Sequence, residues 1–307
     1  MHHEYAVDPH VLGSSWQTFR YLIEKFGFDK GRLIAEFPRK AWFRDVYDSA
    51  SGFSPMQKSR LEILLRDAKR TKVVRTGRSY DPNSAWLSNA LTEHQRLPFQ
   101  AIIAQENVLG SAAVLLAEEF DEQHPRMMIA NPVCVPRDAA SIASALSALL
   151  ENGSHILVVD PFFNPFNARY KSALRECLRI VKARNPNAVC EIHYRYHENA
   201  SSPVDIEKAA VNVFVGVIPD GMSIKIFCWK EKDGGSDFHA RYLLTEAGGI
   251  AIDAGFSAEG PQQTTDMHRI DEAFCKQRIA AFDKAATEYE LVENVLLISA
   301  TGQVTYV

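Results

Sequence analysis

Hydrophobic residues at the start of the chain recur at the spacing of amphipathic helices. Residues 14–28 and residues 57–70 each place apolar side chains on one stripe, at intervals of three and four positions. The first stripe consists of Trp16, Phe19, Leu22 and Ile23, and the second consists of Leu61, Leu64, Leu65 and Ala68. The pattern therefore predicts that the first 70 residues are helical.

Shorter apolar segments continue to about residue 135. Their lengths, and the glycine and proline residues at their ends, separate strands from helices. The predicted strands are residues 71–77, 99–107 and 126–133, and the predicted helices are residues 84–95 and 111–120. The sequence thus predicts an α-rich N-terminal domain over residues 1–135, with no motif that indicates its role.

From residue 136 onward, helical stripes alternate with apolar runs, and a cluster of strands follows. The predicted helices are residues 137–153, 167–186 and 271–289. The predicted strands are residues 155–163, 188–198, 223–231, 238–246, 249–257 and 294–300. This order is typical of an α/β domain, with a mixed sheet and flanking helices, over residues 136–307.

Composition and charge narrow the function classes. The chain has 307 residues and a formal net charge of -4, so any nucleic-acid binding must come from a local patch. Residues 58–78 and residues 169–184 are locally basic. These stretches are either solvated helix faces or contacts for a phosphate-rich ligand, so nucleic acid is a candidate partner.

Other signals are negative. The five cysteines are scattered and include no C-x-x-C pair, which favours reduced thiols in a cytoplasmic protein. No apolar run approaches the ~20 residues that span a bilayer, so we expect no membrane span. There is no phosphate-binding G-x-x-x-x-G-K-[ST] loop and no G-x-S-x-G elbow. We therefore predict no cofactor and no metal.

The candidate chemistry lies in residues 238–246. Because side chains alternate along a strand, His239 and Arg241 are predicted to share one face, about 7 Å apart. A phosphate fits between them: the imidazole can attack phosphorus, and the guanidinium can hold the phosphate oxygens. Glu246, at the predicted strand end, could orient an imidazole. A structural role, in which Arg241 pairs across the hairpin, is the alternative.

This stretch resembles the phospholipase D superfamily, whose motif is His-x-Lys-x4-Asp followed by a Gly-Ser-x-Asn strand. Here the motif is His239, Arg241 and Glu246, then Gly255 and Ser257. The resemblance extends over residues 137–260. It implies a phospholipase D-like fold, with His239, Arg241 and Glu246 as catalytic residues. It also implies substrate-binding roles for Asp160, His193 and Ser257.

Enzymes of that superfamily use two such histidines, and this chain has one motif. Two copies of His239 could meet across the two-fold axis of a homodimer. Alternatively, His193 or His197, which share a predicted strand face with Glu191 and Arg195, could approach the site.

Two functional hypotheses follow. In the first, the protein recognises a phosphodiester of nucleic acid and acts as a metal-independent nuclease through His239, as part of a bacterial defence system. In the second, Arg, Glu and Ala at positions 241, 246 and 258 replace the Lys, Asp and Asn of an active member. The domain is then an inactive adaptor for a protein or phosphate-bearing partner of a multi-component system.

Overall fold

The computed structural model of the chain describes residues 1–197 and 200–307. It divides into two compact units, Met1–Ala130 and Asn131–Val307. The second unit begins before residue 136 because strand β6 (Val133–Arg137) pairs with strand β12 (Gly260–Ile270).

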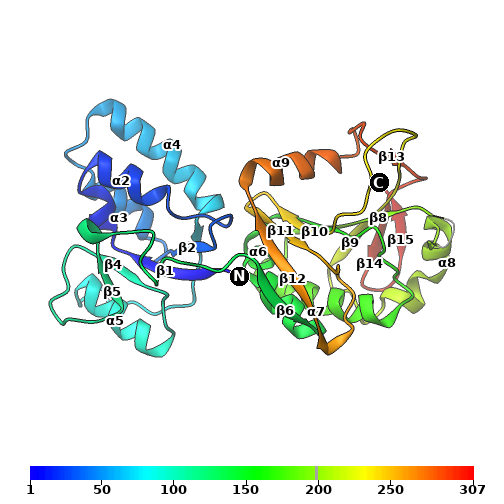
Figure 1. The fold of residues 1–307 in the computed structure, drawn as a ribbon, viewed down its shortest axis with the longest axis horizontal. Helices are drawn as coiled ribbons and strands as arrows, with labels where there is room; N and C mark the ends of the chain where they lie inside the picture. Colours follow the sequence, from blue (N-terminus) through cyan, green and yellow to red (C-terminus); the bar gives the residue numbers. More distant parts are fainter. Residues whose placement is uncertain (198–199) are drawn as a thin grey trace. The chain divides into compact units, whose positions relative to one another are not determined.

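The first unit is built on a five-stranded parallel sheet with the order β3-β2-β1-β4-β5 (Figure 1). The strands are β1 (His3–Val7), β2 (Arg32–Ala35), β3 (Val73–Val74), β4 (Ile102–Ala104) and β5 (Val114–Leu116). The helices are α1 (Pro9–Gly13), α2 (Trp16–Ile23), α3 (Trp42–Ser49), α4 (Pro55–Thr71), α5 (Trp86–Arg96) and the 3₁₀ turn η1 (Ala117–Glu119).

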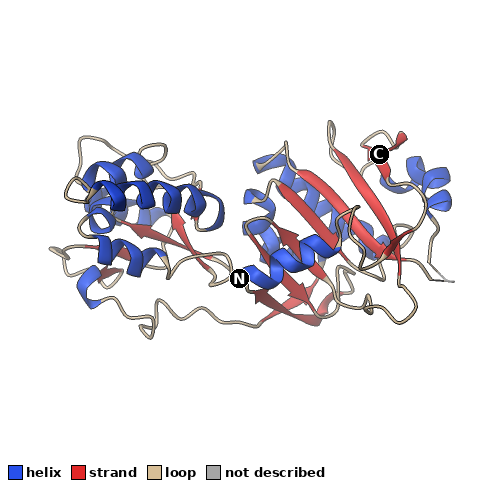
Figure 2. Cartoon of the chain, turned by 90° about the horizontal axis from the view of Figure 1, so that it is seen from above, coloured by secondary structure: helices blue, strands red, loops and turns tan. Residues whose placement is uncertain are grey.

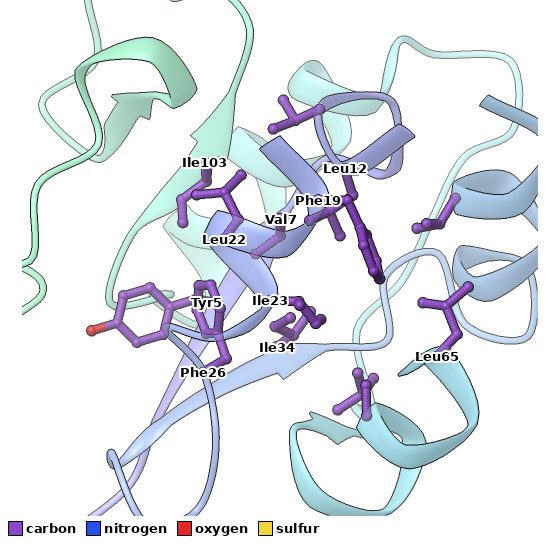
Figure 3. Close-up of a cluster of buried hydrophobic side chains, with 14 of the residues drawn as sticks. Tyr5, Val7, Leu12, Phe19, Leu22, Ile23, Phe26, Ile34, Leu65 and Ile103 are labelled. Carbon is purple, nitrogen blue, oxygen red and sulfur yellow. The ribbon is translucent and has the colours of Figure 1, made fainter. Parts of the chain in front are cut away.

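Alternate residues of these strands enter two separate cores. Tyr5, Val7, Ile34 and Ile103 pack against side chains of α2, α3 and α4 (Figure 3). Ala6, Ala35, Ile102 and Ala104 pack on the opposite face, against α5. The sheet is therefore covered by helices on both faces, which is the usual arrangement for parallel strands.

Several predictions for this unit were wrong. The first 70 residues are not all helical, since they contain β1 and β2. Residues 111–120 form β5 and η1 instead of a helix, and residues 126–133 contain no strand before β6. Strands that are buried on both faces are short apolar runs without a period, so sequence periodicity does not reveal them.

The second unit is a mixed sheet of ten strands with flanking helices, as predicted for the α/β class. Its order is β15-β14-β9-β8-β7-β10-β11-β12-β6, and β13 pairs with β9. Strands β7, β8 and β9 are parallel, and the other pairs are antiparallel. The remaining strands are β7 (His155–Val159), β8 (Val189–Arg195), β9 (Ser223–Lys230), β10 (Tyr242–Thr245), β11 (Gly248–Ile252), β13 (Glu290–Leu291), β14 (Leu296–Ser299) and β15 (Val304–Tyr306).

Helices cover both faces of this sheet. The helices are α6 (Ala139–Asn152), α7 (Ala168–Arg184), α8 (Pro203–Phe214) and α9 (Glu272–Ala281). Helix α9, labelled in Figure 1, lies across one face of the sheet, and α6 and α7 lie on the other, as the two views together show (Figures 1 and 2). The core beneath α9 includes Leu157 and Val159 of β7, Trp229 of β9 and Leu244 of β10.

Some predictions for this unit were wrong as well. Strand β10 begins at Tyr242, so His239 and Arg241 lie in the preceding loop. The reason is the partner strand: Tyr242 pairs with Val159, the last residue of β7. The predicted strand over residues 188–198 ends at Arg195, and residue 198 lies outside the described residues. Helix α8 was missed, although Ser202 and Asp205 form a capping box at its start.

Candidate phosphate-binding site

The candidate site forms where the parallel strands end. Arg195 is the last residue of β8, and Glu231 directly follows β9. Asp160 directly follows β7. Because β10 runs antiparallel to β7, the loop before β10, which carries His239 and Arg241, reaches the same edge of the sheet.

Three side chains gather around one aromatic ring at this edge, and we call them the Arg195–His239–Arg241 cluster. The guanidinium carbon of Arg241 lies 4.8 Å from the centre of the Phe162 ring, and that of Arg195 lies 5.5 Å away. The His239 ring centre lies 6.1 Å from the Phe162 ring centre. Nη1 of Arg195 is 3.5 Å from Nε2 of His239. His239 is exposed, so the cluster is open to solvent.

Glu231 holds Arg195 and the His239 loop together. Its Oε1 accepts a hydrogen bond from Nη1 of Arg195 at 3.0 Å and another from the backbone N–H of Phe238 at 2.6 Å. The Phe238 N–H, with Arg195 as a second donor, lowers the pKa of Glu231 although desolvation opposes the shift. An ionised Glu231 therefore positions the cluster.

Arg241 is positioned by backbone and by a glycine. Its Nη1 donates to the carbonyl oxygen of Asp253 at 2.7 Å. Within the described chain, Arg241 forms no ion pair. Gly255 has a φ of +74°, and a Cβ there would lie 2.9 Å from Cδ of Arg241 and 2.5 Å from Oδ2 of Asp160. Only glycine allows this close approach.

Asp160 stabilises the loops of the site from the protein interior. It is fully buried, so its carboxylate is not exposed, whereas the predicted substrate-binding role requires an exposed side chain. Its two carboxylate oxygens accept from the backbone N–H groups of Phe162 and Phe256, each at 2.9 Å. Desolvation raises the pKa of Asp160, and these hydrogen bonds oppose that shift. The carboxylate thus connects the Phe162 turn to the loop that contains Gly255.

Ser257 is also placed as a structural residue. It is buried, and its hydroxyl donates to Oε1 of Glu259 at 2.5 Å. Its carbonyl oxygen accepts from Nη2 of Arg137 at 3.2 Å. In this structure the hydroxyl of Ser257 therefore contacts Glu259, and its predicted contact with a ligand stays a prediction.

Glu246 lies at the opposite end of β10 from the cluster. Its carboxylate accepts from the backbone N–H and hydroxyl of Ser154, at 2.6 and 2.7 Å, and from the N–H of His155 at 3.1 Å. Five residues of extended chain separate it from Arg241, which is about 16 Å. Glu246 therefore cannot orient His239, and the prediction of a catalytic role is corrected.

His193 lies in the protein interior. It is fully buried, and its ring stacks on Phe227 with the centres 4.6 Å apart. Nδ1 accepts from Nε1 of Trp229 at 3.0 Å, and Nε2 lies 3.3 Å from Glu191. Burial lowers the pKa of His193, which Glu191 partly offsets. The predicted substrate contact is excluded by this burial.

The sequence interpretation missed Phe162 and Glu231, and it gave Arg195 no role at the site. One signal was available: Phe162 follows the Asp-Pro end of a strand and is a large apolar side chain that stays 37% exposed. The contacts of Arg195 carried no sequence signal because its partner His239 is 44 residues away.

The basic stretch on α7 is partly neutralised. Arg169 pairs with Glu259, and Arg179 pairs with Glu176. Among residues 1–197 and 200–307, no group of three or more histidine, cysteine, aspartate or glutamate side chains is arranged to hold a metal. No helix in that part of the chain has the length and apolar character needed to cross a membrane.

Comparisons with known proteins yield distant likenesses. No family model matches the chain. No curated protein sequence matches it either. Phosphatidylserine synthase from Haemophilus influenzae Rd KW20 aligns with a TM-score of 0.35 and 13% identity, over 51% of this chain and 40% of that chain. TrmBL2, an archaeal chromatin protein with a novel mode of DNA binding, aligns with a TM-score of 0.30 and 11% identity, over 53% and 55%. The chain spans about half the length of these structures, and such scores define no family.

Proposed function

We propose that the second unit is a phospholipase D-like domain that binds a phosphodiester of nucleic acid at the Arg195–His239–Arg241 cluster. The observation that supports this most directly is the convergence of two guanidinium groups and an exposed imidazole on the Phe162 ring. These groups are hydrogen-bond donors of the kind that recognise phosphate oxygens.

The charge state of the cluster suits an anion. Arg195 forms an ion pair with Glu231. Within the described residues, the guanidinium of Arg241 donates only to a backbone carbonyl oxygen and has no carboxylate partner. A bound phosphate would supply the missing acceptors and would lie beside Nε2 of His239. Nucleic acid is the favoured source of the phosphate, because α7 follows the Phe162 loop and carries further basic residues.

In the catalytic form of this proposal, His239 is the nucleophile of a metal-independent nuclease. Nε2 forms a bond to phosphorus, the bond from phosphorus to the leaving oxygen breaks, and water then releases the phosphate from the histidine. The leaving oxygen needs a proton. We assign this step to His239 of a second copy in a homodimer, because His193 is buried and Glu246 lies at the far edge. A nuclease of this type would fit a bacterial defence system.

A second candidate is a phospholipase D-like module that binds without turnover. The contact of 3.5 Å between Nη1 of Arg195 and Nε2 of His239 favours it, since a guanidinium facing the nucleophile must move before attack. The acidic residue of the motif, Glu246, also accepts hydrogen bonds from Ser154 and His155 at the start of β7, so it does not contact His239. Binding is common to both candidates, and hydrolysis separates them.

Binding is tested by fluorescence anisotropy with labelled single-stranded DNA and RNA of about 20 nucleotides. We expect Arg241→Ala to weaken binding by about tenfold, because one charge-assisted contact is lost. Arg20→Ala, which removes an exposed arginine of α2 in the first unit that pairs with Glu24, is the control and should change binding less than twofold. Unchanged binding by Arg241→Ala would contradict both candidates.

Hydrolysis is tested with the same substrates in EDTA. Cleavage by the wild type that is lost in His239→Ala, together with a dimeric mass in solution, would support the nuclease. Equal signals from the two proteins would leave the binding module as the function.

A further inference from the structure

A second basic site lies in the first unit, independent of the cluster described above. A pocket with a volume of about 710 Å³ opens where β2 and β3 end. Glu36 directly follows β2 and Arg75 directly follows β3, and both line it. The pocket lies on the side of the sheet where the carboxyl ends of the parallel strands meet, which is the side on which open α/β sheets bind ligands, but beside β2 and β3 and not at the switch point between β1 and β4.

The pocket gathers far more positive than negative charge. Its basic lining residues are Arg39, Lys40, Arg44, Arg66, Lys69 and Arg75. Two carboxylates, those of Glu36 and Glu62, also line it. The basic residues come from four places in the chain: the loop after β2, helix α3, helix α4 and the residue after β3. The fold therefore brings together charges that are distant in the sequence.

Most of these cations are not neutralised by the protein. Within the part of the chain that the structure describes, Arg39, Arg66, Lys69 and Arg75 form no ion pair and no side-chain hydrogen bond. Arg44 is different, since it pairs with Asp45 at 3.0 Å. Like charges concentrated in one pocket repel one another, and a multivalent anion relieves that repulsion.

The pocket also has an apolar wall and a strained residue at its rim. Phe43, Tyr47 and Leu65 provide the wall, and Nζ of Lys69 lies 5.9 Å from the centre of the Phe43 ring. Lys40 has a φ of 68°, in the left-handed region that favours glycine. Its backbone N–H donates to Oε1 of Glu36 at 3.0 Å, which holds this conformation. Such strain is concentrated at ligand sites.

We propose that this pocket binds a nucleotide carrying two or three phosphate groups, such as a nucleoside triphosphate. The unpaired arginines and Lys69 would hold the phosphates, and Phe43 or Tyr47 would pack against the base. The volume is within the range of about 300–1,000 Å³ that is typical of small-molecule sites. The proposal does not rest on the function of the second unit.

The test is calorimetric titration of the full chain with ATP, with adenosine and with a single-stranded oligonucleotide. We expect ATP to bind and adenosine to fail, because the phosphates provide the recognition. The double variant Arg66→Ala with Arg75→Ala should weaken ATP binding by at least about tenfold. The matched control, Arg60→Ala with Arg70→Ala, removes the same charge from α4 outside this pocket and should change it less than twofold.

Further variants keep the outcome interpretable. Arg39→Gln alters an exposed side chain and should weaken ATP binding with an unchanged melting temperature, even if the double variant folds poorly. Arg241→Ala should leave ATP binding unchanged, which separates this site from the Arg195–His239–Arg241 cluster. Equal losses in the two double variants, or no ATP binding by the wild type, would each overturn the proposal. So would oligonucleotide binding that the double variant Arg66→Ala with Arg75→Ala abolishes while ATP binding is retained.

Discussion

His193 and His239 both lie near an arginine or lysine and a carboxylate, but their surroundings differ completely. His193 is fully buried beneath α9, between Trp229 and Glu191. His239 is exposed at the edge of the sheet, beside Arg195. The comparison shows that a buried histidine has its hydrogen-bonding groups occupied by the protein. An exposed histidine at the strand ends can contact a ligand.

The largest expected effect tests this difference directly. His193→Ala removes a stacked ring and leaves the indole N–H of Trp229 without its acceptor, so we expect a loss of about 2–4 kcal/mol in the free energy of unfolding. His239→Ala should change it by less than about 0.5 kcal/mol, because the side chain is exposed. Chemical denaturation of the full chain measures both. Similar losses in the two variants would contradict the distinction.

An intermediate effect is expected at Gly255, which supports the exposed edge. Gly255→Ala adds backbone strain and a Cβ that meets Arg241 and Asp160, so it should destabilise the protein by about 1–3 kcal/mol and weaken nucleic-acid binding. Gly216→Ala is the matched control, because Gly216 has a φ of +77° and nothing within 4 Å of an added Cβ. If both variants bind equally well, the position of Arg241 does not matter for the ligand.

The smallest expected effect is a pH dependence of the free energy of unfolding, caused by His155 beside Glu191. Nε2 of His155 lies 3.0 Å from Oε2 of Glu191, and Nζ of Lys225 lies 3.1 Å from Oε1 of the same carboxylate. The neighbouring Glu191 carboxylate raises the pKa of His155 above its usual value of 6.5, although desolvation opposes the shift. The protonated form is therefore stabilised in the folded state, fully below pH 6.5, and this stabilisation disappears as the pH rises through the raised pKa.

His155→Gln should accordingly destabilise the protein more at about pH 5.5 than at about pH 9. The difference should stay below about 1 kcal/mol, because His155 is partly exposed and its ion pair is screened. Denaturation curves at the two pH values provide the measurement. A larger loss at the alkaline value would show that the pair with Glu191 does not control this site.

Much of the local structure was predictable because its cause is local. The stripes of α2, α4, α6 and α7 repeat every three or four residues, and such a pattern identifies a helix without knowledge of its partners. The apolar run of β7 is similarly clear. By contrast, β1 and β2 are only five and four residues long, and their apolar residues are buried on both faces, so they carry no alternation.

The candidate site was predictable only in part. His239 and Arg241 stand out as a closely spaced pair, and they do lie at one edge of the sheet. Their contacts with Arg195 and Phe162 depend on the strand order β8-β7-β10, which joins segments far apart in the chain. Glu246 lies at the other end of β10 because the five residues from Arg241 to Glu246 form an extended strand and not a turn.

The sequence by itself determined the amphipathic helices, the α/β character of residues 136–307 and the pair of His239 with Arg241. These features follow from the spacing of side chains along a single segment. Only the tertiary structure decided which histidine is enclosed and which carboxylate supports the site, and it alone brings distant arginines into one pocket. Whether a side chain is buried, and which charges lie near it, depends on the order of the strands and on the helices that pack over them. Both are set only when the chain folds.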